Sequence, residues 1–175
     1  PKRDWSSDVC SSDLSQASAG TNSVSIGYQS GFTGQSQNSV SLSYQSGYFN
    51  NGTNSISAGF QAGYTNQNMS SISLGYQSGY YNQSSGAISI GFQSGFDSQN
   101  QNSIAIGYQS GFTGQNQYAI SLGYLSGQNN QGSYSVAIGN NVLVNNTSSQ
   151  TYSVAIGNNI SSNTNSVLMN TKNSM

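Results

Sequence analysis

The sequence predicts an all-β fold, a repeat β-solenoid or β-roll built from coils of 16 residues. The phrase at residues 23–32 (SVSIGYQSGF) recurs, and the residue after its second aliphatic falls at positions 27, 43, 59, 75, 91, 107, 123 and 139, a constant step of 16. Each phrase alternates aliphatic and small residues, as a strand does. Only 4% of the residues are charged, against about 25% in ordinary soluble domains. A fixed step indicates units that bury their apolar faces by stacking on their neighbours.

The repeats divide the chain into segments. Regular repeats span residues 23–138, with a partial repeat before them at 15–22 and degenerate repeats after them at 139–170. We interpret residues 171–175 as a truncated end. Residues 4–14 contain no Gly, Asn or Gln, and they resemble the translation of a common sequencing-library adapter. We therefore interpret residues 1–14 as a disordered, adapter-derived artefact outside the fold.

Each repeat begins with a short strand. In the first regular unit, Val24 and Ile26 point one way while Ser25 and Gly27 point the other. β-Branched residues dominate the aliphatic positions, as a pleated, half-buried surface prefers. We expect these aliphatic residues to form the core: Val24, Ile26, Val40, Leu42, Ile56, Ile72, Leu74, Ile88, Ile90, Ile104, Ile106, Ile120, Leu122, Val136, Ile138, Val154 and Ile156.

Glycines and a polar stretch predict the bends of each coil. Gly27 and Gly31 follow the strand, and residues 33–38 supply a polar return turn. One unit therefore reads as two short strands and two bends.

Two aromatic columns and one glutamine column follow the same step. The first aromatic column contains Tyr28, Tyr44, Phe60, Tyr76, Phe92, Tyr108 and Tyr124, the second contains Phe32, Tyr48, Tyr64, Tyr80, Phe96 and Phe112, and the glutamine column contains Gln29, Gln45, Gln61, Gln77, Gln93 and Gln109. Coils stacked at strand spacing would place each ring about 4.8 Å from its copy, where offset rings stack. Two interpretations stay open: the rings cover the core and a subunit interface, or they form an exposed ladder that binds glycans or another filament. Stacked glutamine amides can bond along a ladder.

The composition argues against several functions. Residues 15–175 carry only Asp97 and Lys172 as charged residues, too few cations to neutralise nucleic-acid phosphates. The longest apolar run of this region is three residues, against the roughly 20 that a membrane-spanning helix needs, so we expect no membrane insertion of this segment.

Catalytic groups are equally scarce. The chain has no His and a single Cys, so its serines lack an activating base, and no carboxylate pair is available for acid-base work. Asp97 alone supplies too few oxygens for a calcium site. We predict that this segment is not an enzyme and holds no cofactor or metal.

Short motifs connect the repeat to known fibre proteins. Residues 135–139 and 153–157, both SVAIG, resemble the head repeats of trimeric autotransporter adhesins. The form at residues 106–111 (IGYQSG) is similar to repeats in phage and giant-virus fibre proteins. The resemblance covers residues 23–170 and implies a left-handed parallel β-roll, three chains packed side by side, and binding to host surface proteins. The repeat is longer than that of adhesin heads, and large aromatics occupy the Phe32 column, which implies a wider coil or longer turns.

These observations predict a non-enzymatic fibre or adhesin segment, extracellular, on a cell surface or on a virion. Nine coils would form a rod of roughly 43 Å. Expected partners are further copies of the chain, as a homotrimer or a filament, and glycans or host surface proteins. The alternative function is a self-assembling filament subunit stacked through its β-coils and Tyr/Gln ladders. Two weaker alternatives are an ice-binding solenoid, for which a threonine column is missing, and a disordered Gln/Asn-rich tract.

Overall fold

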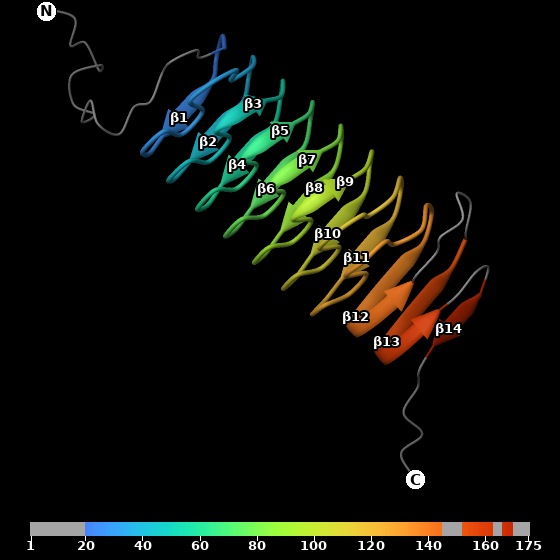
Figure 1. The fold of residues 1–175 in the computed structure, drawn as a ribbon. Coiled ribbons are helices and arrows are strands. Elements are labelled where there is room, and N and C mark those ends of the chain that lie inside the picture. Colours follow the sequence, from blue (N-terminus) through green and yellow to red (C-terminus); the bar gives the residue numbers. More distant parts are fainter. Residues whose placement is uncertain (1–19, 145–151, 163–165, 170–175) are drawn as a thin grey trace, which may run out of the picture.

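The computed structural model describes residues 20–144, 152–162 and 166–169. These residues form a straight rod of stacked coils, shown in Figure 1, and no helix occurs among them. The predicted β-solenoid is confirmed. The interpretations of residues 1–14, 15–19 and 171–175 lie outside the described residues.

The larger of two sheets runs the length of the rod. Its ten parallel strands have the order β1-β2-β4-β6-β8-β10-β11-β12-β13-β14. They are β1 (Val24–Ile26), β2 (Val40–Leu42), β4 (Ile56–Ala58), β6 (Ile72–Leu74), β8 (Ile88–Ile90), β10 (Ile104–Ile106), β11 (Ile120–Leu122), β12 (Val136–Val144), β13 (Val154–Ser162) and β14 (Val167–Met169).

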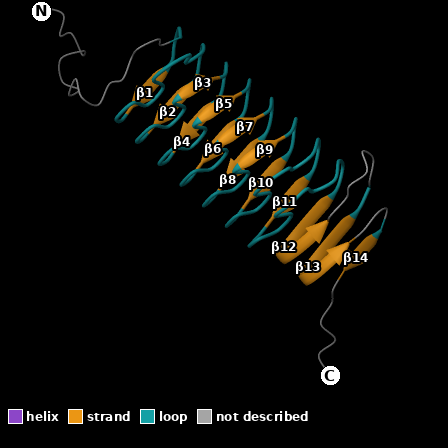
Figure 2. Cartoon of the chain, viewed as in Figure 1, coloured by secondary structure: helices purple, strands orange, loops and turns teal. Residues whose placement is uncertain are grey.

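A smaller sheet forms the opposite wall of the coils, as Figure 2 shows in orange. It contains the parallel strands β3 (Phe49–Asn51), β5 (Thr65–Gln67), β7 (Tyr81–Gln83) and β9 (Asp97–Gln99), in that order. Single bridges from Thr33 to Phe49, Asp97 to Thr113 and Thr113 to Asn129 continue its ladder beyond the four strands. A regular coil thus has two short strands and two bends, as predicted.

The strand register follows the sequence repeat. Val24 pairs with Val40, and each later step through β12 also joins residues 16 apart. The step becomes 18 where Val136 pairs with Val154, and 13 where Val154 pairs with Val167. The changed spacing of the degenerate C-terminal repeats therefore keeps the aliphatic positions in register.

The prediction of an aliphatic core is wrong. From β1 to β13, each strand of the larger sheet buries the small residue between its first two aliphatic positions and turns those aliphatics outward, as in β6, where Ser73 is buried between half-buried Ile72 and Leu74. None of the residues expected in the core is buried: Val24, Ile26, Val40, Leu42, Ile56, Ile72, Leu74, Ile88, Ile90, Ile104, Ile106, Ile120, Leu122, Val136, Ile138, Val154 and Ile156 lie on the outer face.

In the regular coils the buried serine and amide already fill the interior, which explains this inversion. A methyl group added at Gly63 would overlap the Ser57 hydroxyl and the Gln67 amide, and the same overlap recurs at Gly79 with Ser73 and Gln83. An aliphatic side chain in place of Ser57 or Ser73 would therefore have no room beside the amide of the opposite wall. Small hydroxyls from one sheet and one amide from the other fill the space instead.

Four columns of mostly polar side chains make up this core. The buried residues are Ser25, Ser41, Ser57, Ser73, Ser89, Ala105, Ser121, Ala137 and Ala155 in the larger sheet, Ser39, Ser55, Ser71, Ala87, Ser103, Ala119, Ser135 and Ser153 directly before its strands, Ser30, Ser46, Ala62, Ser78, Ser94, Ser110 and Ser126 at the first bend, and Gln35, Asn51, Gln67, Gln83, Gln99, Gln115 and Gln131 on the opposite wall. Such groups are stable inside a protein only when they are hydrogen-bonded.

The buried glutamines meet this requirement through bonds along and across the rod. Gln83 Nε2 lies within hydrogen-bond distance of the Ile72 carbonyl oxygen (2.9 Å) and of Gln99 Oε1 (3.1 Å). Gln83 Oε1 accepts from Ser73 Oγ and, at 3.0 Å, from Gln67 Nε2. An amide ladder from Gln67 to Gln131 therefore joins these coils from the inside.

The core becomes apolar near the C-terminal end of the described region. Val142 takes the position of buried Ser126 one coil later, since the Gly127 amide donates to its carbonyl as Gly111 does to Ser126. Val142 and Val144 pack with Ala137 and Ala155, and Ile160 covers them. The degenerate repeats thus keep the fold while changing how the interior is filled.

Candidate functional site

The outward aliphatic residues of the larger sheet form one continuous surface, here called the aliphatic face. Its columns run straight along the rod because each residue pairs with its equivalent in the next coil. Val24 is 43% exposed and Ile26 is 49% exposed, and the residues of the middle coils are half-buried. Of the described residues only Asp97 is charged, and it lies in the smaller sheet. An uncharged apolar surface of this regularity is typical of an interaction site.

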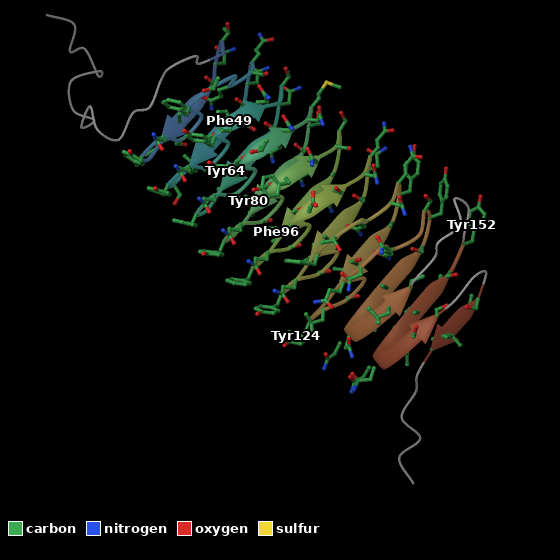
Figure 3. All side chains as sticks on the ribbon, in the orientation of Figure 1. Phe49, Tyr64, Tyr80, Phe96, Tyr124 and Tyr152 are labelled. Carbon is green, nitrogen blue, oxygen red and sulfur yellow. The ribbon has the colours of Figure 1, made fainter. Side chains whose placement is uncertain are left out.

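The first aromatic column lies at the bend that follows the aliphatic strands. Its successive rings stack with centroid separations of 5.0 to 5.3 Å from Tyr28 to Tyr124. The rings are 37 to 55% exposed, and Tyr124 projects from one edge of the rod in Figure 3. The spacing predicted from the sequence is confirmed, and this first ladder presents ring surface to solvent.

The glutamine column stands beside the first ladder and fixes the bend. Gln45 Nε2 donates to Gln29 Oε1 at 2.8 Å, and the four following steps through Gln109 measure 2.9 Å. All six glutamines have φ between 47° and 51°, a left-handed conformation that is costly for a residue with a side chain. The amide ladder helps to offset that cost, so this column is structural.

The second aromatic column lies at the start of the smaller sheet, where Figure 3 labels Tyr64, Tyr80 and Phe96 in a row. Its rings stack at 4.8 to 5.1 Å and are half-buried. Phe49 and Tyr81 pack edge-on against it. Burial, followed by hydrogen bonding with Tyr81, raises the pKa of Tyr80 to about 12. Burial and the neighbouring Tyr48 also raise the pKa of Tyr64.

A third aromatic stack was not identified from the sequence. Tyr118, Tyr134 and Tyr152 lie at the other bend, with centroid separations of 5.1 and 5.4 Å. All three are exposed, and Tyr152 stands at that edge in Figure 3. The same residue type recurs after 16 and then 18 residues, the two steps of the strands themselves, which is the signal that could have revealed the stack.

The described residues offer little that could carry chemistry. They contain no group of three or more His, Cys, Asp or Glu residues placed to hold a metal ion. Asp97 accepts a hydrogen bond from Ser98 Oγ at 2.9 Å, within strand β9. In the described ranges no helix has the length and apolarity needed to cross a bilayer. The surfaces that recur from coil to coil in the described residues are the aliphatic face, the aromatic ladders and the bends.

Comparison with protein-family models, with curated proteins and with solved structures finds no match. The resemblance to adhesin heads and viral fibre repeats therefore stays a prediction carried by the short motifs.

Proposed function

We propose that this chain is a non-enzymatic segment of an extracellular or virion-surface fibre, a stiff rod that assembles with copies of itself and attaches to other surfaces. The observation that carries the proposal is the aliphatic face. A monomer seldom leaves a long apolar stripe in water, and this stripe extends about 43 Å along ten strands. A partner that covers it fully must have the same period.

A second copy of the chain fits that requirement best. It offers aliphatic columns with the same step and no charge to desolvate. Three copies that turn their aliphatic faces toward a common axis would bury all three stripes and leave the ladders outside. A homotrimer with this arrangement gives the rod a hydrophobic centre that the single coil lacks.

The first ladder is the proposed attachment surface. Its rings repeat at about 5 Å over seven coils, so a glycan or a host surface protein would meet many equivalent weak contacts. Linked weak contacts raise the overall affinity by multivalency without any deep pocket. Attachment through aromatic rings would also explain how a chain with so few charges can bind to another surface.

An attachment assay tests this proposal. Beads coated with the full chain are passed over immobilised polysaccharides and matrix proteins, and retention is compared with that of albumin-coated beads. We expect retention by the wild-type chain and a large reduction for Phe60→Ser combined with Tyr76→Ser. Met69→Ser, at an exposed position outside the ladders, should behave as wild type. Retention no higher than that of albumin would contradict the proposal.

A filament subunit is the second candidate, favoured by the open ends of the sheets. The larger sheet of the described region ends in β1 and β14, and such edge strands can pair with another chain. End-to-end stacking would continue the larger sheet from one chain to the next. This function predicts particles of unlimited length, whereas side-by-side assembly predicts a fixed number of chains.

A further inference from the structure

A polar groove crosses the bend opposite the first ladder. It is open to solvent, has a volume of about 370 Å³ and is lined by Ser84, Asn100, Gln101, Asn116, Gln117 and Ser133. These residues belong to the return turns that precede β8, β10, β11 and β12, so the groove crosses four consecutive coils, a span of roughly 14 Å along the rod. Neither the aliphatic face nor the columns expected from the sequence contribute to it.

The main chain at the groove is already bonded between coils. The Asn100 amide donates to the Gln115 carbonyl at 2.9 Å, and the Tyr118 amide donates to the Gln101 carbonyl at 3.1 Å. An extended peptide that binds by strand addition needs an unpaired strand edge. The turns do not present one here, so recognition must use the side chains.

Those side chains are amides and hydroxyls. Gln117 Nε2 donates to Gln101 Oε1 at 3.1 Å, and Asn100 Nδ2 donates to Asn116 Oδ1 at 3.4 Å. A side-chain amide has two N–H donors and an oxygen with two lone pairs, so one ladder bond leaves both donor and acceptor capacity. A ligand that both donates and accepts repeatedly matches this lining.

The groove also lacks charge. No lining residue is ionisable, and Asp97 is the only charged residue in the described part of the chain. A phosphate, sulfate or carboxylate would find no cation to pair with, and a cation would find no carboxylate among the lining residues. The lining therefore favours a neutral ligand.

An aromatic surface adjoins the groove in the chain. Tyr118 and Tyr134 directly follow the lining residues Gln117 and Ser133, stack at 5.1 Å and are 42% and 43% exposed. Amides beside exposed rings suit a ring-shaped ligand with hydroxyls at its rim and C–H groups on its face. A volume near the lower end of the range for small-ligand sites accommodates about two such rings.

We propose that this turn-edge groove binds a neutral oligosaccharide lying along the rod. The inference deepens the proposed function, on which it rests, by naming one site and one class of ligand. Each chain of a side-by-side assembly would carry this groove on its outer edge. Several grooves on one particle would strengthen attachment to a polysaccharide by multivalency.

Titration calorimetry with the full chain tests the proposal, using cellotetraose, maltotetraose, chitotetraose in its N-acetylated form and a sulfated tetrasaccharide as probes. We expect at least one neutral tetrasaccharide to bind with a Kd on the order of 1 mM. Gln101→Ala combined with Gln117→Ala should weaken that binding about tenfold, because two amide partners are lost. Gln37→Ala combined with Thr53→Ala changes the same column of the turns outside the groove and should leave the affinity unchanged.

Three results would overturn the site: no binding of any neutral probe, equal weakening by both variant pairs, or preference for the sulfated sugar. Thermal unfolding of each variant checks that the solenoid remains folded. The result is separable from the proposed function. Absence of sugar binding by a chain whose beads still attach would refute the groove alone, whereas binding of a soluble sugar by a chain that fails to attach would refute the fibre function alone.

Discussion

The buried serines of the first bend are held by main-chain carbonyls of the next coil. Ser94 Oγ donates to the Ala105 carbonyl oxygen at 2.6 Å, and Ser30, Ser46, Ser78 and Ser126 make the equivalent bond. Ser110 stands in the same column and is equally buried, but its Oγ has no hydrogen-bond partner. Ala62 shows that the column accepts a residue without a hydroxyl.

This difference predicts unequal effects of the same substitution. Ser94→Ala should lower the free energy of unfolding by about 1 to 2 kcal/mol, because the buried Ala105 carbonyl loses a donor. Ser110→Ala should not lower the free energy of unfolding, since it removes a buried hydroxyl that has no hydrogen-bond partner. Chemical denaturation of the two variants measures the difference. Equal destabilisation would show that the hydroxyls of this column act only by filling space.

The buried glutamines tolerate substitution less well than the buried serines of the first bend. Removing the Gln83 amide would leave Ser73 Oγ, Gln67 Nε2 and Gln99 Oε1 short of a partner at once. A half-satisfied polar network is worse than an apolar one. The amide column therefore fixes which residues of adjacent coils can face each other.

At the scale of a strand, the alternation could be predicted from the sequence but its direction could not. The period-two pattern places Ile72 and Leu74 on one face and Ser73 on the other, and the structure confirms this. Apolar residues usually point inward, so we expected Ile72 to be buried. The buried serine and amide of that coil leave no room for this side chain, a constraint that appears only when Gly63 and Gly79 are seen against the opposite wall.

Some of the side-chain stacks could likewise be predicted from the sequence, and others could not. The columns that begin at Tyr28 and Phe32 are evident because nearly every repeat carries an aromatic residue there. The Tyr118 stack and the turn-edge groove occupy positions where the residue type changes from coil to coil. At such positions the sequence predicts only a polar, low-complexity turn. Their side chains come together only in the folded coils.

The second aromatic column, which contains Tyr80, predicts a loss of stability at alkaline pH. Tyrosine in the unfolded chain titrates near its ordinary pKa of about 10, whereas the pKa of Tyr80 in the folded chain is raised to about 12. The unfolded state loses its proton first, so the free energy of unfolding is unaffected below about pH 10 and falls as the pH rises from about 10 to 12.

Tyr80→Phe isolates this effect, since phenylalanine already occurs in the column at Phe96 and Phe112. The variant keeps the stacked ring and removes the ionisable hydroxyl. The denaturation midpoint should fall between about pH 9 and about pH 11 in both proteins, and this fall should be smaller in the variant than in the wild type. An equal fall in both proteins would place the alkaline sensitivity elsewhere in the molecule.

At the scale of the whole molecule, the rod has a polar interior and an apolar outside stripe, the reverse of an ordinary domain. The interior is stabilised by hydrogen bonds and needs no further partner. The aliphatic face contributes its hydrophobic free energy only when another surface covers it. Assembly is therefore expected to add stability that the single coil lacks, and the oligomer to be more stable than the monomer.

Two substitutions on the aliphatic face should prevent this assembly. Ile88→Thr combined with Ile104→Thr keeps β-branched residues in the strands and makes their outer surface polar. Since a buried isoleucine contributes roughly 1.5 to 3 kcal/mol, the pair should shift the chain toward its monomer mass of 18.3 kDa. Tyr81→Thr changes the opposite wall and should leave the mass of the assembly unchanged. An unchanged mass in the isoleucine variant would place the interface elsewhere.

The most direct test of the account is the molar mass of the full chain in solution, measured by light scattering over a range of concentrations. Side-by-side assembly predicts a single species at three times 18.3 kDa, about 55 kDa. A mass distribution that grows without limit would favour the filament instead. A folded monomer at 18.3 kDa at every concentration would contradict the claim that the aliphatic face is an interface between copies of this chain.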